Sequence, residues 1–301
     1  MAKLLLIDYS VLIGIQKIIS YHSFEIAKKG TAEKRPITAP SEQLKVVQKR
    51  ILRLLQPIKR RNWLISGEKG KSYIDNGKAH IIGKYALTID IRKFYDNCIR
   101  EPVYHFFTEK LMVSPDAAKL LSDIVTYNRG IPTGCPTSQI IAYYAYADMF
   151  DEIADLAVNY SCVFTLYVDD MTFSSQYSFD KDKLCLEIDR TLRKYGHKPK
   201  YKKIKYYSKN DAKPITGTIV TSDNRLDVPN GLQEKVFNRF IGIKKQLSVS
   251  DASFDTEIAE EITKLRGQLQ AVQNIVPNKF SEIKRVMTQA QKEITAGRLS
   301  G

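Results

Sequence analysis

The sequence predicts an α+β fold in which a mixed body of strands and helices precedes an all-helical C-terminal module. Apolar and polar residues alternate as in strands at 84–91 and 162–175, and segments on either side show apolar residues at helical spacing, which together predict the mixed body. Residues 231–297 form three helical segments separated near 249–253 and 276–278, which predicts the C-terminal module.

The N-terminal elements are expected to belong to the folded body. The first twenty residues are apolar, but Asp8 interrupts them and no clean cleavage site follows, so we expect a core element and not a secretion signal. The first long helix is expected at 41–57, where Ser41 is placed like a capping-box residue and Pro57 ends the segment. A basic run beside the only tryptophan, KRRNW, follows it.

The central elements alternate between strand and helix. They are expected, in order, as a strand at 84–91, a capped helix at 114–127, a long helix at 137–160, two short strands at 162–175, a helix at 181–195 and a basic, then β-like, stretch at 198–222. The two short strands meet at Asp169 and Asp170, which predicts a β-hairpin.

Composition narrows the class of protein. The 301 residues are 43% hydrophobic, which indicates a globular chain, and the net charge of +14 favours a polyanionic partner, most simply nucleic acid. An anionic membrane surface and an ordinary basic enzyme are the alternatives. No run approaches the ~20 apolar residues that cross a bilayer. The four cysteines form no C-x-x-C pair, so neither a zinc ribbon nor a thioredoxin-like site is indicated, and a reducing, cytoplasmic location is expected.

Three acidic residues lie in apolar, strand-like surroundings. Asp169 and Asp170 lie inside FTLYVDDMT, and Asp90 lies inside YALTIDI. Burying a carboxylate costs several kcal/mol unless a partner compensates it. If the strands converge, the cluster suits hard divalent cations such as Mg²⁺, two of which support phosphoryl transfer. The alternative is that each Asp is an ordinary turn residue.

Other segments add the surroundings that phosphate chemistry needs. The Gly- and Pro-rich stretch RGIPTGCPTS precedes a helix, so its backbone can approach another chain closely. Upstream, KRPITAP places Lys34 and Arg35 in a loop. Residues 193–213 contain nine Lys or Arg and one acidic residue, with tyrosines interleaved, which is typical of a surface that binds nucleic acid.

In this order the motifs resemble those of reverse transcriptases, and specifically the bacterial retron type. RPITAP resembles the fingers motif, and LTIDIRKFY, GIPTGCPTS, YVDD and GHKPKYKK resemble four successive palm motifs. NGKAH (76–80) and PITGTIV resemble two retron signatures. The resemblance covers about residues 28–290 and implies a right-hand polymerase fold with an antiparallel palm sheet. It implies an N-terminal region and fingers at 1–84, a palm at 85–222 that includes part of the fingers at about 100–135, and a helical thumb at 223–301.

The resemblance also implies a set of site residues. Two Mg²⁺ ions would be held by catalytic Asp90, Asp169 and Asp170, with Ile91 as a further metal ligand. Tyr95 would be a steric gate against a 2′-hydroxyl, and Lys203, or Lys202, would lie near the leaving pyrophosphate. The full expected nucleotide-binding set is Lys34, Arg35, Lys93, Phe94, Tyr95, Thr133, Gly134 and Lys203. The expected RNA-binding set is Asn76, His80, Arg193, Lys198, Lys200 and Lys202, with a structural role as the alternative for Asn76 and His80.

Three positions depart from the family pattern. Gly77 replaces a signature alanine and Ile215 a signature valine, and both changes are mild. Thr133 stands where most relatives have glutamine, which puts nucleotide affinity or fidelity in question and leaves polymerase identity intact.

Retron resemblance implies partners as well. These are a cognate structured noncoding RNA, its branched DNA product, deoxynucleotides and, because no effector domain fits in this chain, a separate effector protein acting in antiphage defence. The alternatives are a related defence reverse transcriptase with protein-primed or untemplated synthesis, and a noncatalytic RNA-binding scaffold. An RNA-dependent RNA polymerase is disfavoured by the bulky Tyr95.

Overall fold

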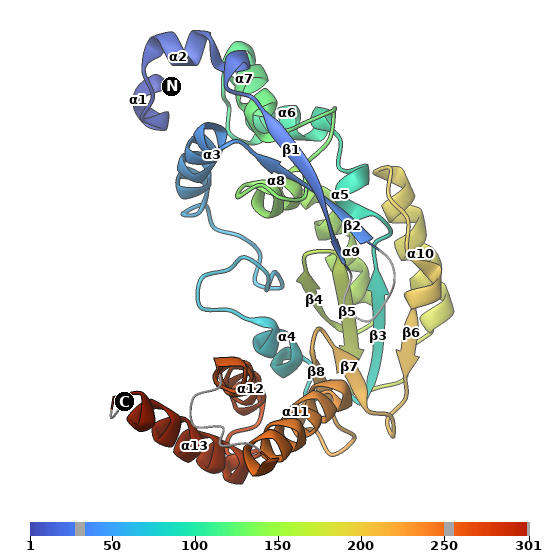
Figure 1. The fold of residues 1–301 in the computed structure, drawn as a ribbon. Helices are drawn as coiled ribbons and strands as arrows, with labels where there is room; N and C mark the ends of the chain where they lie inside the picture. The colour runs from blue at the N-terminus through green and yellow to red at the C-terminus, as the bar shows by residue number, and fades with distance from the viewer. Residues whose placement is uncertain (28–33, 250–255, 300–301) are drawn as a thin grey trace. The chain divides into compact units, whose positions relative to one another are not determined.

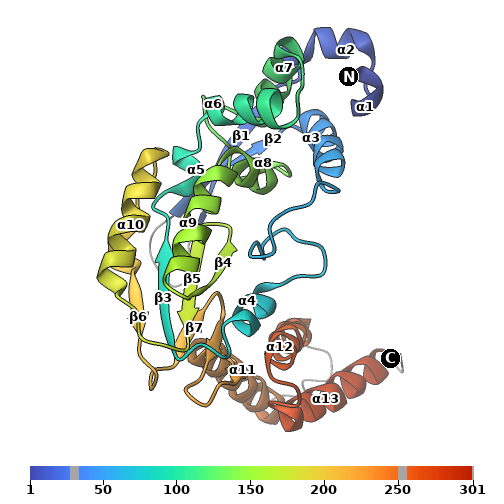
Figure 2. The ribbon, with the colours of Figure 1, turned by 180° about the vertical axis from the view of Figure 1, so that it is seen from behind.

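The computed structural model describes residues 1–27, 34–249 and 256–299, which form two compact units (Figures 1 and 2). The first unit comprises Met1–Lys69, Leu87–Phe173 and Phe179–Tyr206, and the second comprises Gly70–Ala86, Ser174–Ser178 and Tyr207–Gly301. The mixed strand and helix content, with helices at the C-terminus, confirms the expected fold class. The domain boundaries expected at 85 and 223 stay predictions.

The first unit holds most of the predicted body. Its helices and helical turns are α1 (Ala2–Leu5), α2 (Tyr9–Ile13), η1 (Ile15–Lys17), α3 (Glu42–Leu55), α5 (Phe94–Asn97), α6 (Arg100–His105), η2 (Phe106–Lys110), α7 (Pro115–Val125), α8 (Ser138–Ala145), α9 (Ala147–Asn159), α10 (Lys181–Lys194) and η3 (Tyr201–Lys203). As predicted, α3 begins after Ser41, whose hydroxyl accepts a hydrogen bond from the Leu44 amide. Leu5 and Ile15 of the N-terminal segment are buried, which confirms its place in the core.

A four-stranded sheet in the order β4-β5-β3-β6 carries the predicted acidic residues. Its strands are β3 (Tyr85–Asp90), β4 (Val163–Tyr167), β5 (Asp170–Ser175) and β6 (Lys205–Tyr207). Only Val168 and Asp169 connect β4 to its neighbour β5, so the predicted hairpin is confirmed. A separate antiparallel pair, β1 (Tyr21–Ala27) with β2 (Lys34–Pro40), places Arg35 opposite Ile26. The expectation that Lys34 and Arg35 lie in a loop is therefore wrong, because pairing with β1, a distant contact that KRPITAP alone does not reveal, makes this segment a strand.

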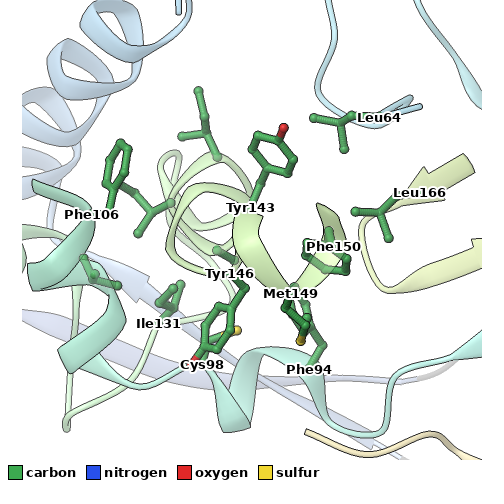
Figure 3. Close-up of a cluster of buried hydrophobic side chains, with 14 of the residues drawn as sticks. Leu64, Phe94, Cys98, Phe106, Ile131, Tyr143, Tyr146, Met149, Phe150 and Leu166 are labelled. Carbon is green, nitrogen blue, oxygen red and sulfur yellow. The ribbon is translucent and has the colours of Figure 1, made fainter. Parts of the chain in front are cut away.

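The helix expected at 137–160 is two helices, α8 and α9, interrupted at Tyr146. The Tyr146 hydroxyl accepts a hydrogen bond from the Ile99 amide (3.0 Å) and donates one to the Asn97 carbonyl (3.2 Å). Its ring lies among Phe94, Phe150 and other buried apolar side chains (Figure 3). Apolar periodicity continues through the break, which is why the sequence predicted a single helix.

The second unit contains the predicted C-terminal helices. Its elements are α4 (Tyr73–Ala79), the antiparallel strands β7 (Lys213–Ile215), β8 (Thr218–Val220) and β9 (Leu226–Asp227), and the helices α11 (Asn230–Val249), α12 (Thr256–Ile275) and α13 (Ser281–Leu299). A separate apolar core, which includes Val236, Ile262 and Met287, holds these helices together. In the part of the chain that the structure describes, no helix combines the length and apolarity needed to span a membrane.

The two signature stretches NGKAH and PITGTIV interlock inside the second unit. The Asn76 amide donates to the Thr216 hydroxyl (2.8 Å), and His80 Nδ1 lies 2.7 Å from the Ser174 hydroxyl. A Cβ placed on Gly77 would lie 2.2 Å from Thr218 Oγ1, a hydroxyl that donates to the Ile215 carbonyl. The glycine that departs from the family pattern therefore makes room for Thr218.

Gly77→Ala should destabilise the protein, although alanine is the better helix former. Helix propensity favours alanine by about 1 kcal/mol, whereas overpacking costs about 1–3 kcal/mol, so a net loss of about 1 kcal/mol is expected in urea unfolding. Gly267→Ala, in α12 with nothing within 4 Å of its Cβ, is the matched control and should be neutral or stabilising. The double variant Gly77→Ala/Thr218→Ala should lose less free energy of unfolding than the two single variants lose together, because removing the Thr218 hydroxyl removes the clash. Losses that add fully would refute the clash.

Candidate active site

The end of β3 and the start of β5 bring the three predicted acids to one place. Because β3 and β5 are neighbours, Asp90 at the end of β3 lies beside Asp169 and Asp170 at the hairpin. The Ile91 amide donates to the Asp169 carbonyl (3.0 Å), and this hydrogen bond holds the residue after β3 against the hairpin turn.

The electrostatics show that the carboxylates share one half-buried space. Burial, then the charges of Asp170 and Asp90, raise the pKa of Asp169 to about 6. Burial and the charge of Asp90 also raise the pKa of Asp170. At neutral pH the cluster therefore holds repelling negative charge that a cation would relieve.

Lys203, and not its neighbour Lys202, supplies a cation to this cluster. Lys203 Nζ lies 2.6 Å from Asp90 Oδ2, and this hydrogen bond raises the pKa of the lysine. Backbone bonds hold its segment against the end of β3: the Lys200 amide donates to the Asp90 carbonyl (2.7 Å), and the Arg92 amide donates to the Lys198 carbonyl (2.9 Å). The structure thus separates two lysines that the sequence left open.

The segment after β3 places the expected gate beside the acids. Lys93 has a left-handed backbone (φ 49°) and is the N-cap residue of α5, Phe94 is buried, and Tyr95 is half-buried. Burial and then the charge of Asp169 raise the pKa of the Tyr95 hydroxyl, while the Arg35 charge acts in the opposite direction. Tyr95 therefore lies within electrostatic range of both Asp169 and Arg35.

The glycine-rich loop docks on β2, the strand that carries Arg35. The Gly134 amide donates to the Thr38 carbonyl (2.9 Å), and Thr133 Oγ1 lies 3.4 Å from the Pro36 carbonyl. A Cβ on Gly134 would lie 2.6 Å from that same Thr38 oxygen, so the close approach requires glycine. Lys34 is exposed and pairs with Glu25 at 3.2 Å.

The donor set fits a hard divalent cation by its chemistry. Three carboxylates converge, two of them with pKa values raised by burial and mutual charge, and Asp90 already accommodates the ammonium of Lys203. Across residues 1–27, 34–249 and 256–299, however, no three His, Cys, Asp or Glu side chains are grouped as a ready metal site. To bind a metal ion, the Asp90 carboxylate would have to release Lys203 or contact both the lysine and the metal.

Sequence comparison decides the family. Residues 26–243 match the family model described as "Reverse transcriptase (RNA-dependent DNA polymerase)". The chain belongs to the reverse transcriptase family. Its curated relatives include the Retron Ec83 reverse transcriptase of Escherichia coli, 25% identical over 90% of this chain and 88% of that protein. They also include the Retron Se72 reverse transcriptase of Salmonella heidelberg, 27% identical over 54% of this chain and only 42% of that protein.

Both of these relatives are retron reverse transcriptases, which agrees with the retron type that the motifs of the sequence predicted. Among solved structures, the chain is similar to an apo telomerase from Candida tropicalis truncated from its C-terminal domain, with a TM-score of 0.52 and 13% identity. That match covers 71% of this chain and 55% of the telomerase, and it supports the reverse transcriptase fold alone.

The residues expected to bind RNA divide into two groups. Asn76 and His80 are buried in the second unit, which disfavours direct RNA contact by these side chains. The remaining four, all in the first unit, are exposed or half-buried: Arg193, Lys198, Lys200 and Lys202. Arg193 is already bound by Asp189 (3.0 Å) and by the Tyr201 hydroxyl (2.8 Å).

Sequence reasoning missed His197, which lies in GHKPKYKK among the lysines. Its ring is buried against Phe94 and Tyr146, with centroid distances of 5.3 and 4.6 Å. Neither ring nitrogen has a hydrogen-bond partner among the residues that the structure describes, and burial lowers the pKa of His197 to about 4. The imidazole is therefore neutral and anchors the Lys198–Lys203 segment by packing.

Low pH should destabilise the folded protein, partly through His197. Its folded pKa of about 4 lies below the unfolded value of about 6.5, so the unfolded state binds more protons between these values. The free energy of unfolding should fall as pH drops from 6.5 to 4. His197→Phe should remove about 3 kcal/mol of that loss in urea unfolding measured at each pH. An identical pH profile for both proteins would show that His197 is not held neutral.

Proposed function

We propose that this chain is a retron RNA-directed DNA polymerase that copies a cognate structured noncoding RNA into single-stranded DNA. Synthesis would start from an internal 2′-hydroxyl and leave a branched RNA–DNA product. The observation that carries this proposal is the convergence of Asp90, Asp169 and Asp170 beside Lys203, with Tyr95 and Arg35 within electrostatic range. Family membership and the retron relatives support it.

Each side chain has a proposed part in the reaction. Asp90, Asp169 and Asp170 would hold two Mg²⁺ ions, with Ile91 as a further ligand. When bound, the ions would lower the pKa of the attacking hydroxyl and neutralise charge on the triphosphate. Arg35 and Lys203, with Lys34 nearby, bind the triphosphate oxygens, and the backbone at Lys93 and Phe94 approaches them. Little covalent chemistry falls to the protein, so geometry carries most of the catalysis.

The sugar and base of the nucleotide would meet a different set of residues. The Tyr95 ring excludes a 2′-hydroxyl, because its position beside Asp169 is half-buried and already packed against Phe94. Thr133 and Gly134 line the nucleotide pocket from the glycine-rich loop, where Gly134 bonds the Arg35 strand. Thr133 is shorter than the usual glutamine, so contacts to the nucleotide from this position are reduced.

Tyr95→Ala should admit ribonucleotides. Loss of the ring opens space where a 2′-hydroxyl would lie, and we expect the ratio of kcat/KM for dNTP over NTP to fall about tenfold or more. Tyr95→Phe keeps the ring and is the matched control, so its ratio should stay near that of the unmodified protein. The ratio is measured by single-nucleotide primer extension. An unchanged dNTP-over-NTP ratio in Tyr95→Ala would show that Tyr95 is not the steric gate.

The nucleic acid that copurifies with the protein tests the retron assignment. Sequencing should return a branched single-stranded DNA joined to one structured RNA. The exposed Lys200 and Lys202, with Lys198 and Arg193, are proposed to contact the RNA backbone. DNA without an RNA branch would favour protein-primed or untemplated synthesis, the second candidate that Thr133 leaves open. Bound RNA with no DNA product in an inactive protein would favour a noncatalytic scaffold.

The biological setting is proposed from the same resemblance. A retron enzyme would act in the cytoplasm in antiphage defence, together with a separate effector protein. Loss of phage protection on deleting this chain's gene, and its return on complementation, would support that setting. Protection that survives the deletion would contradict it.

A further inference from the structure

The catalytic hairpin contains a backbone conformation that its own residue disfavours. Val168, which directly precedes Asp169, has a φ of 61°. A β-branched residue in the left-handed region is a true outlier, and such strain persists only where surrounding contacts hold it. The turn that carries Asp169 therefore needs an external restraint.

A short segment of the first unit supplies contacts along this hairpin. The Leu166 amide donates to the Trp63 carbonyl (2.9 Å), and the Ile65 amide donates to the Leu166 carbonyl (3.0 Å). Leu64 and Leu166 form a parallel bridge, and their side chains lie near each other in Figure 3. The segment Trp63–Ser66 thus lies beside the end of β4 and joins it through a single parallel bridge.

The last contact of this segment falls on the strained residue. The Val168 amide donates to Ser66 Oγ at 2.8 Å, and Ser66 is only 5% exposed. On the other side of the turn, the Asp169 carbonyl accepts from the Ile91 amide. The Tyr167–Val168 peptide before the turn and the Asp169–Asp170 peptide after it are therefore both held, the first by the Ser66 side chain and the second by the Ile91 amide that follows β3.

The segment itself is fixed at both ends. Arg60, which precedes the segment, forms an ion pair with Glu68, which follows it, and this ion pair connects the two ends of the segment. After it, Gly67 turns the chain with a φ of 72°, where a Cβ would lie 3.1 Å from the Gln139 side chain. A hydroxyl on a segment held in this way can act as a rigid acceptor for Val168.

We propose that Ser66 is a positioning residue, whose hydroxyl holds the left-handed Val168 and thereby the backbone that carries Asp169. The proposal rests on the polymerase function proposed above. Ser66 is not one of the residues proposed to bind nucleotide or metal and acts through the Val168 amide, so its loss should lower kcat and leave KM for dNTP nearly unchanged.

The test compares Ser66→Ala with a matched buried serine. Ser122→Ala removes a fully buried hydroxyl that donates to the Ala118 carbonyl within α7, and it serves as the control. Ser66→Ala should lower kcat about tenfold, the effect of one lost hydrogen bond to a strained group. Ser66→Thr should restore activity, and Val168→Gly should restore part of it in the Ser66→Ala background, because glycine adopts the left-handed backbone without strain. Equal kcat values for Ser66→Ala and Ser122→Ala would overturn the proposal.

Hydrogen exchange separates this proposal from the proposed function. Amides in the peptide that spans Val168 should exchange faster in Ser66→Ala and not in Ser122→Ala, whether or not the protein polymerises DNA. If the unmodified protein makes no DNA, the polymerase proposal fails. The hydrogen-exchange measurement would still test whether Ser66 holds the backbone at Val168. Should Ser66→Ala not fold, Ser66→Cys, a weak acceptor of similar size, replaces it with the same expected losses. Unchanged exchange in these variants would refute the positioning role.

Discussion

Asp169→Asn should lower RNA-templated DNA synthesis by at least about a thousandfold, because catalysis here depends on charge placed at the reacting phosphate. The same change should not weaken the fold. Burial and the neighbouring acids raise the pKa of Asp169 to about 6, so at pH 7 its ionised form opposes folding. Replacing it with a neutral amide should raise the free energy of unfolding by about 1–2 kcal/mol.

A neighbouring acid provides the control for this prediction. Asp96 is exposed on α5, six positions after Asp90, and it takes no proposed part in the site. Asp96→Asn should keep nearly full primer extension. The combination of lost synthesis with raised stability marks Asp169 as a residue kept for function and not for folding. Retained extension by Asp169→Asn, or lost activity that follows lost stability, would contradict the assignment.

Gly134→Ala should lower kcat/KM for dNTP by about a hundredfold or more. The new Cβ would lie 2.6 Å from the Thr38 carbonyl oxygen, a backbone atom that cannot rotate away, so β2 and the glycine-rich loop must separate. Arg35 lies on β2, three residues before Thr38, and would move with it. A displacement of about 1 Å at such a site is enough for an effect of this size.

The same loop supplies the control. A Cβ on Gly130 would meet its nearest atom, the Cys98 carbonyl oxygen, at 3.4 Å, which is close to ordinary contact. Gly130→Ala should therefore retain most of the activity. Steady-state kinetics with a primed RNA template and varied dNTP measures both variants. Equal activities would show that the Gly134 approach to β2 does not position the nucleotide site.

Local sequence patterns were enough to predict the elements that carry the acids. Alternation at 84–91 and 162–175 gave β3 and the β4–β5 hairpin, and apolar surroundings singled out Asp90 and Asp169 as residues that needed a partner. The sheet order that brings them together is a long-range property, and family resemblance rather than periodicity supplied it. The cap at Ser41 was predictable because a helix start depends on residues close in sequence.

Contacts between distant segments account for what the sequence did not reveal. The break between α8 and α9 falls at Tyr146, whose hydroxyl bonds with the Asn97 and Ile99 backbone, and helical periodicity does not register such long-range contacts. The sequence does not distinguish Lys202 from Lys203. In the structure, the Arg92 amide donates to the Lys198 carbonyl and the Lys200 amide donates to the Asp90 carbonyl, and in this arrangement Lys203 contacts Asp90. Ser66 lies in an ordinary loop sequence and is recognised only by the strained amide that it accepts.

Extension of a DNA primer on an RNA homopolymer, with the complementary dNTP and Mg²⁺, tests the central claim most directly. The purified protein should add deoxynucleotides to the primer, and it should lose this activity when EDTA removes the metal and regain it when Mg²⁺ is restored. Asp169→Asn, measured in parallel, should remain inactive under every condition. Failure of the folded, unmodified protein to extend the primer, or extension that persists in EDTA, would contradict a metal-dependent polymerase site at Asp90, Asp169 and Asp170.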